Sequence, residues 1–100
     1  MNEPERPTGT ERRRFLLEML PVGSVGAEIG VHQGDFSRAI LDTVRPSRLH
    51  LIDPWRYESS TTYERALYGG RASKGQQELD DRYLAVLDRF AISTSASARR

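Results

Sequence analysis

The feature that most constrains the fold is a short apolar run that ends in a glycine turn and leads into a helical pattern. The run covers residues 25–31, and its turn contains Gly30 and Gly34. After the helical pattern, a second apolar run at residues 49–52 ends at Asp53. Strand, helix and strand in this order predict a parallel βαβ unit with a right-handed crossover. Ligands of such sheets bind outside the carboxyl ends of the strands, so we expect a binding crevice there.

Residues at this end of the unit have the properties that a nucleotide-type ligand needs. Gly30 and Gly34 let the backbone come close to a ligand, because a Cβ atom at either position would narrow the gap. The helix that starts near Asp35 points its free N–H groups into the same gap. Asp53 lies at the mouth of the second strand, where a carboxylate can accept both hydroxyl groups of a ribose.

The spacing of the turn indicates which ligand it suits. A dinucleotide site needs the pattern G-x-G-x-x-G, whereas this chain has Glu28, Gly30 and Gly34 with no glycine between the last two. Glu28 would repel a pyrophosphate and suits a ligand that carries an ammonium or sulfonium group. This combination resembles motif I of the Rossmann-like (class I) S-adenosylmethionine-dependent methyltransferases, with Asp53 at the acidic end of their second strand.

Other residues carry the same resemblance. Three short segments look like the small bacterial branch of the class I methyltransferases: Asp53-Pro54-Trp55, Tyr68-Gly69-Gly70 and Asp81-Arg82-Tyr83. The resemblance covers roughly residues 10–90. It implies S-adenosylmethionine as the cofactor and transfer of its methyl group to an acceptor, which we expect to be a small molecule. It names no residue as the base that would deprotonate the acceptor.

The resemblance assigns cofactor binding to six residues: Glu28, Gly30, His32, Gly34, Ser37 and Asp53. Glu28 would bind the methionine ammonium, and His32 would supply a backbone contact with its side chain at the pocket rim. Ser37 would either bond the ligand carboxylate or support the helix start. We expect no metal site, because His32 has no second ligand at a recognisable spacing. Trp55 is expected to pack in the core rather than stack on the adenine.

The amino-terminal part of the chain predicts one more helix. Residues 1–8 are polar and are expected to form a flexible lead-in. The helix would be capped by Thr8 or Thr10 and closed by Pro21. Its apolar residues share one predicted face: Phe15, Leu16, Met19 and Leu20.

The carboxyl-terminal half is harder to interpret. Residues 56–76 are polar and contain three tyrosines, so we expect a cap over the crevice or a mobile loop. Apolar spacing from Gln77 to Phe90 predicts another helix. Residues 92–100 are small and polar with no β periodicity, which predicts a disordered tail.

The predicted fold class is α/β: an incomplete Rossmann-like methyltransferase fold with the order helix-β-α-β-loop-helix and two parallel strands. Residues 9–91 would form the N-terminal half of the domain, because the family continues into a third strand and several more. Two strands alone are marginal, and their open edges favour self-association. We therefore expect the isolated chain to fold partly at best and to bind the cofactor weakly or not at all.

Composition excludes several other classes. The chain has no cysteine, which excludes disulfides and thiolate metal sites, and its net charge is only +1. Glutamates surround Arg12, Arg13 and Arg14, so we expect no binding to nucleic acid. No apolar run approaches the length of a membrane span, and we expect a cytoplasmic protein without membrane contact. Two alternatives stay open: a non-catalytic module that binds cofactor or completes the sheet of another chain, and an NAD- or nucleotide-binding protein.

Overall fold

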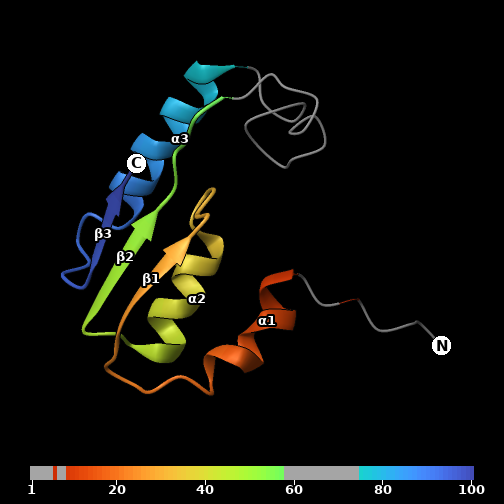
Figure 1. The fold of residues 1–100 in the computed structure, drawn as a ribbon, viewed down its shortest axis with the longest axis vertical. Helices are drawn as coiled ribbons and strands as arrows, with labels where there is room; N and C mark the ends of the chain where they lie inside the picture. The colour runs from red at the N-terminus through yellow and green to blue at the C-terminus, as the bar shows by residue number, and fades with distance from the viewer. Residues whose placement is uncertain (1–5, 7–8, 58–74) are drawn as a thin grey trace.

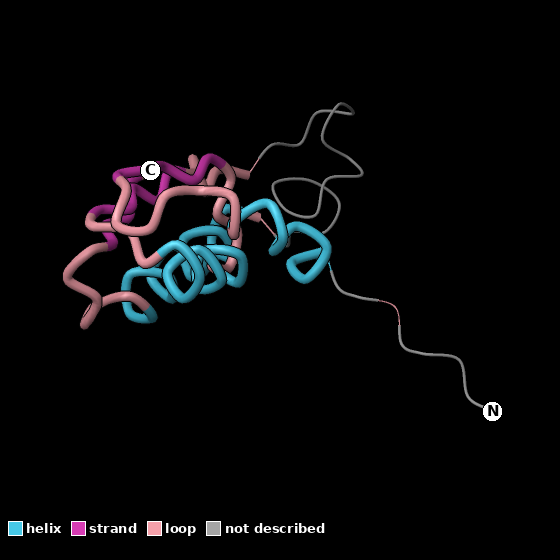
Figure 2. The backbone as a smooth tube through the Cα atoms, turned by 90° about the horizontal axis from the view of Figure 1, so that it is seen from below, coloured by secondary structure: helices cyan, strands magenta, loops and turns pink. Residues whose placement is uncertain are grey.

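The computed structural model of this chain describes residue 6, residues 9–57 and residues 75–100. Within these residues the elements are α1 (Gly9–Leu17), β1 (Val25–Ile29), α2 (Asp35–Val44), β2 (Arg48–Ile52), α3 (Gln76–Arg89) and β3 (Ala96–Arg99). The strands form one parallel sheet in the order β1-β2-β3. Figure 1 shows the strands side by side, and Figure 2 shows the helices gathered on one face of the sheet. The described residues therefore form a small α/β domain with an open parallel sheet.

The predicted βαβ unit is present at the expected residues. β1 pairs with β2 in parallel, with Ile29 opposite Ile52. The helix between them, α2, begins after Gly34 and ends before Arg45, and both flanking residues have left-handed backbone angles, φ 90° and φ 47°. These two turns let the chain leave the sheet and return to it within a short distance. The prediction of a parallel pair with a helical crossover is confirmed.

The carboxyl end of the chain differs from its prediction. Residues 92–100 do not form a disordered tail, because β3 lies within them and pairs in parallel with β2 as a third strand. The Leu49 N–H group, for example, donates to the Ser95 carbonyl at 2.6 Å. β3 has alanine on its partly buried side and serine or arginine on the other, so the alternation is weak, because alanine is small and only slightly apolar. Pairing with the open edge of β2 stabilises a strand that its own residues do not indicate.

The first helix also differs from its prediction. α1 ends at Leu17 and not at Pro21, and the chain then leaves it through a turn in which the Leu20 N–H donates to the Leu17 carbonyl at 3.1 Å. Leu17 is the buried apolar residue of α1, whereas the four apolar residues that were expected to share one helical face are exposed: Phe15, Leu16, Met19 and Leu20. α1 packs against α2, and the Arg13 guanidinium lies 4.1 Å from the centre of the Phe36 ring. The contact with α2 decides which face of α1 is buried.

The core lies between the sheet and its helices. Leu51 of β2 is fully buried and belongs to the same apolar cluster as Leu79 and Val86 of α3. On the opposite face of the sheet, Val25 and Ile29 of β1 are exposed, and no described element covers them (Figure 2). The fold is thus a two-layer arrangement in which one face of a parallel sheet is bare.

Two predicted segments fall largely outside the described residues. They are the lead-in at residues 1–8, of which only residue 6 is described, and the cap or loop at residues 56–76, of which residues 58–74 are not described. The end of the second segment already belongs to a helix, since α3 starts at Gln76. None of the helices within the described ranges is long and apolar enough to span a membrane.

Candidate functional site

The glycine turn lies at the carboxyl ends of β1 and β2, as the βαβ pattern predicts. Residues 30–34 connect β1 to α2, and the Gly30 N–H donates to the Ile52 carbonyl at 2.9 Å. Gly30 has φ +87°, and a Cβ atom there would meet no atom within 4 Å. The position therefore needs glycine for its backbone angle, and the space beside it is open.

Gly34 lies against the end of α3. Its φ is +90°, and a Cβ atom there would lie 2.8 Å from the ring of Phe90. The space on the Cβ side of Gly34 is therefore filled by the end of α3, and the contact of Gly34 with a ligand stays a prediction. Arg89, the last residue of α3, reinforces this contact: its guanidinium donates to the Gln33 carbonyl at 3.1 Å and pairs with Asp35 at 2.8 Å. The helical spacing of α3 gives no sign of these polar contacts, so the sequence did not reveal them.

Asp53 binds the backbone of its own chain. One carboxylate oxygen, Oδ2, accepts the N–H groups of Val31 at 2.8 Å and His32 at 3.0 Å, and Oδ1 accepts the N–H of Trp55 at 2.8 Å. The residue is 1 % exposed. Asp53 thus links the glycine turn to the segment after β2. Contact with the hydroxyl groups of a ribose, which the sequence suggests, stays a prediction; in this structure the carboxylate is buried and its described bonds are to the backbone.

Glu28 and Ser37 form the second polar pair of the site. The Ser37 hydroxyl, in the first turn of α2, donates to Oε1 of Glu28, at the end of β1. Both residues are buried, Glu28 with 9 % and Ser37 with 0 % of their surface exposed. Burial raises the pKa of the Glu28 carboxyl above its ordinary value of 4.5, although the Ser37 hydrogen bond and the charge of Arg13 act in the opposite direction. The Ser37 hydroxyl thus links α2 to the end of β1, and both roles considered for it, binding a ligand carboxylate and supporting the helix start, stay predictions.

His32 and Trp55 complete the wall of the turn. His32 has φ +58°, and its carbonyl accepts the indole N–H of Trp55 at 3.0 Å. Its imidazole Nε2 lies 3.3 Å from the guanidinium of Arg82 in α3. Trp55 is fully buried, and its ring centre lies 4.8 Å from that of Tyr83. Trp55 therefore packs against α3 in this structure.

The amide of Gln76 ties the segment after β2 to the start of α3. It donates to the Trp55 carbonyl at 2.9 Å and accepts the Tyr57 N–H at 2.8 Å. Sequence reasoning missed Gln76, because nothing in its neighbourhood separates it from any other polar residue at a helix start. Together with Arg89, Gln76 holds the glycine turn and the end of β2 against α3.

The site is therefore a hydrogen-bonded glycine turn with two buried acids beside it, Glu28 and Asp53. Among the described residues, no group of three or more histidine, aspartate and glutamate side chains is placed to hold a metal ion. Comparison with protein-family models, with curated protein sequences and with solved structures finds no match to this chain. What the site can do must be argued from its own geometry and chemistry.

Proposed function

We propose that this chain contributes the cofactor-binding half-site of an S-adenosylmethionine-dependent methyltransferase of Rossmann-like fold. The observation that carries the proposal is the Glu28 carboxylate, which is buried at the carboxyl end of β1 beside the glycine turn. Its partner among the described residues is the Ser37 hydroxyl, and no ion pair joins it to a described arginine. A buried carboxylate in this situation favours a cation from outside the chain.

The chemistry of Glu28 distinguishes between the two cofactor classes that the sequence leaves open. The ammonium group of S-adenosylmethionine would supply the positive charge that the buried Glu28 carboxylate needs as a partner. The pyrophosphate of NAD would bring further negative charge to the same place, and Asp53 already lies close enough to raise the pKa of Glu28. Glu28 therefore supports a cationic ligand over a dinucleotide.

The glycine turn supplies the second part of the fit. Gly30 leaves open space beside the backbone, at the end of the sheet where ligands of parallel α/β folds bind. The turn is held on one side by Asp53 and on the other by Arg89. A turn fixed in this way loses little conformational freedom when a ligand binds. We assign Asp53 the positioning of the turn and Glu28 the contact with the cofactor.

S-adenosylmethionine, when bound, supplies the methyl group that is transferred. The residues of this half-site bind and orient the cofactor, and the alignment of the methyl group with its acceptor provides much of the rate in such reactions. The proposal does not assign an acceptor-binding residue or a base within the described residues. The acceptor class that we propose is a small molecule.

The experiment that tests this function is a titration of ¹⁵N-labelled protein with S-adenosylhomocysteine, followed by amide chemical shifts. We expect saturable shifts at Glu28 and Gly30 with a Kd of roughly 0.1–1 mM. Glu28→Gln should weaken binding at least about tenfold, because it removes the charge and keeps the shape. The matched control is Glu18→Gln, at an exposed position after α1, which should bind like the parent.

Three results would contradict the proposal. They are the absence of any shift at millimolar ligand from a protein with a dispersed spectrum, equal binding by the parent and Glu28→Gln, and tighter binding of NAD than of S-adenosylhomocysteine. The last result would favour the nucleotide-binding alternative.

A further inference from the structure

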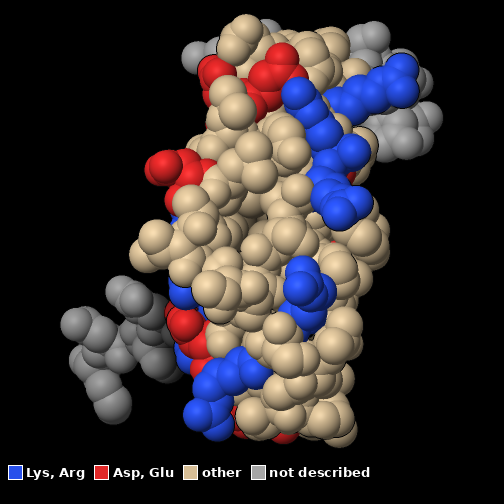
Figure 3. Space-filling model, turned by 90° about the vertical axis from the view of Figure 1, so that its left-hand side faces the viewer, with Lys and Arg blue, Asp and Glu red and all other residues tan. Residues whose placement is uncertain are grey.

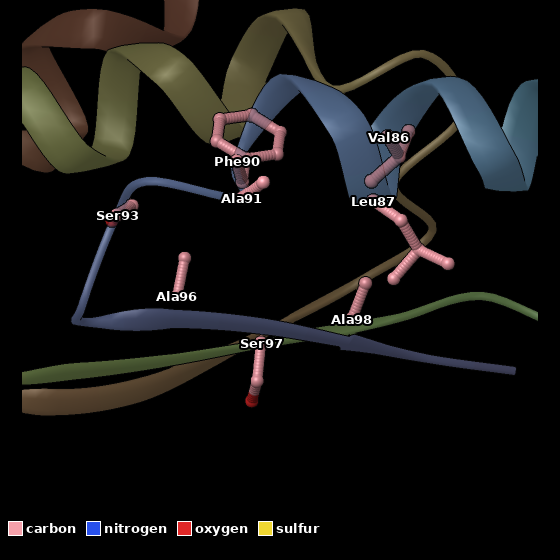
Figure 4. Close-up of a pocket in the computed structure, with 8 residues that line it drawn as sticks. All are labelled: Val86, Leu87, Phe90, Ala91, Ser93, Ala96, Ser97 and Ala98. Carbon is pink, nitrogen blue, oxygen red and sulfur yellow. The ribbon is translucent and has the colours of Figure 1, made fainter.

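A cavity separates α3 from β3, and one of its walls is Phe90, whose ring also lies against Gly34. Its volume is about 250 Å³, and its walls include Val86, Leu87 and Phe90 from the α3 side and Ala96 and Ala98 from β3. Figure 4 shows the two alanine side chains pointing toward α3 across the cavity, while Ser97 points to the other face of the sheet. The cavity exists because alanine is too short to reach the helix. It has room for one or two apolar side chains from elsewhere.

The backbone of β3 beside this cavity has unused hydrogen-bonding groups. β3 is an edge strand of the described sheet, and the carbonyl groups of Ser95 and Arg99 accept from the N–H groups of Leu49 and Asp53 on the β2 side. Because the backbone groups of a strand alternate in direction, those of residues 96 and 98 point away from β2. Two donors and two acceptors therefore face outward, directly beside an apolar cavity.

The charges around this edge favour an acidic partner. On the face opposite the helices, β3 presents Ser97 and the exposed Arg99, and β2 presents the exposed Arg48. The described acidic side chains of the sheet end, Glu28 and Asp53, are buried, and the exposed ones lie on the helices or, as Glu18 does, in the turn after α1. Figure 3, which looks onto this side, shows Asp and Glu mainly along the helix margin and Lys and Arg mainly toward the sheet. A strand added at this edge would place alternate side chains next to Arg99.

We propose that the free edge of β3 and the adjoining cavity bind an extended segment of a partner protein in which apolar and acidic residues alternate. The partner segment adds a strand to the sheet through the outward groups of Ala96 and Ala98. Its apolar side chains fill the cavity, and its acidic side chains lie beside Arg99. A second copy of β3 fits less well, because it would present only alanine side chains to the cavity and would bring a further arginine.

The test uses the whole chain and a defined probe. The probe is a fluorescein-labelled heptapeptide of alternating glutamate and valine with blocked ends, and binding is followed by fluorescence anisotropy. We expect saturable binding with a Kd below about 1 mM. Two control peptides separate the contributions: glutamate alternating with serine lacks the side chains that fill the cavity, and lysine alternating with valine reverses the charge. Both should bind the parent protein roughly tenfold more weakly.

Two variants test the two parts of the site. Ala98→Leu fills the cavity from within and should weaken binding of the glutamate–valine peptide roughly tenfold or more. Arg99→Glu should weaken the same peptide about fivefold and restore binding of the lysine–valine peptide. Arg12→Glu, the same change at an exposed position on α1, should alter neither. If Ala98→Leu disturbs the fold, the reversed preference of Arg99→Glu between the two charged peptides still tests the proposal.

Amide hydrogen exchange gives a readout that is independent of affinity. In the free protein the N–H groups of Ala96 and Ala98 should exchange quickly, while those of Ser97 and Arg99 are protected by β2. The peptide should slow exchange at Ala96 and Ala98. The proposal fails if the peptide does not bind, if Arg99→Glu leaves the preference between the two charged peptides unchanged, or if protection appears elsewhere. Protection of residues 96 and 98 without peptide, rising with protein concentration, would instead show that a second copy occupies the edge.

Discussion

The Ser37 hydroxyl donates a hydrogen bond to the Glu28 carboxylate, and this bond joins the end of β1 to the first turn of α2. Both groups are buried beneath the glycine turn. The pair gives Glu28 a fixed position without neutralising its charge. The arrangement therefore costs stability in the absence of a cation and provides a place where a cationic ligand can bind.

The first prediction is that Glu28→Gln stabilises the free protein at neutral pH. The pKa of Glu28 is raised in the folded state, so its contribution to stability is fully present below the unfolded pKa and is lost as the pH rises through the folded pKa. At pH 7 the variant should gain up to about 1 kcal/mol in free energy of unfolding, and the gain should shrink toward pH 4. Urea unfolding of the parent and the variant at pH 7 and at pH 4 measures this difference in the free energy of unfolding. A variant less stable than the parent at pH 7 would show that the charge is compensated within the chain.

The second prediction concerns Asp53. Asp53→Asn replaces one of the two accepting oxygens by an NH₂ group, so whichever way the amide turns at least one of three backbone N–H groups loses its acceptor, and the change should cost roughly 1–3 kcal/mol of stability. Asp42→Asn is the control, because Asp42 is exposed and forms only a 3.7 Å pair with Arg38. Its effect should stay within about 0.5 kcal/mol. Equal effects in thermal unfolding would mean that Asp53 does not hold the glycine turn.

The third prediction separates the two glycines of the turn. Gly30→Ala and Gly34→Ala share the cost of a left-handed backbone angle, about 1 kcal/mol, but only Gly34→Ala also places a Cβ against Phe90. Gly34→Ala should therefore be the less stable variant, and replacing Phe90 by leucine should recover part of the loss. For Gly30→Ala, the loss in free energy of S-adenosylhomocysteine binding should instead exceed the loss in free energy of unfolding. A Gly30→Ala protein that binds like the parent would remove Gly30 from the cofactor site.

The sequence predicts the βαβ unit because its signals are local: an apolar run, a glycine turn and helical spacing. It also brings Asp53 to the glycine turn correctly, since parallel strands end at the same edge of a sheet. It does not predict the partners of Asp53, because three backbone N–H groups leave no trace in the pattern of side chains. For the same reason the contact between Gly34 and Phe90, which are far apart in the chain, could only be found in the structure.

The two errors in the fold have a common cause. The buried face of α1 and the existence of β3 are decided by what these elements pack against, α2 and the edge of β2, and not by their own residues. β3 is short and built of alanine, serine and arginine, a composition that β propensity alone would reject. The addition of β3 gives β2 a neighbour on both sides. Partial folding of the isolated chain stays a prediction, which the cooperativity of its thermal unfolding would test.

The last prediction tests β3 directly, with proline at two neighbouring positions. The register places the Ser97 N–H toward β2 and the Ala98 N–H toward the open edge. Proline removes the donor at either position and imposes the same restriction on φ. Ser97→Pro should therefore cost roughly 1 kcal/mol or more beyond Ala98→Pro in urea unfolding followed by far-ultraviolet circular dichroism.

The stabilities of Ser97→Pro and Ala98→Pro distinguish three descriptions of β3. Equal and large losses would show that both N–H groups are bonded in the protein, which contradicts the free edge. Two neutral substitutions would show that the strand contributes nothing to stability, as expected for a disordered tail. A loss confined to Ser97→Pro, together with weaker peptide binding by Ala98→Pro, supports both a third strand and an outer edge that is open to a partner.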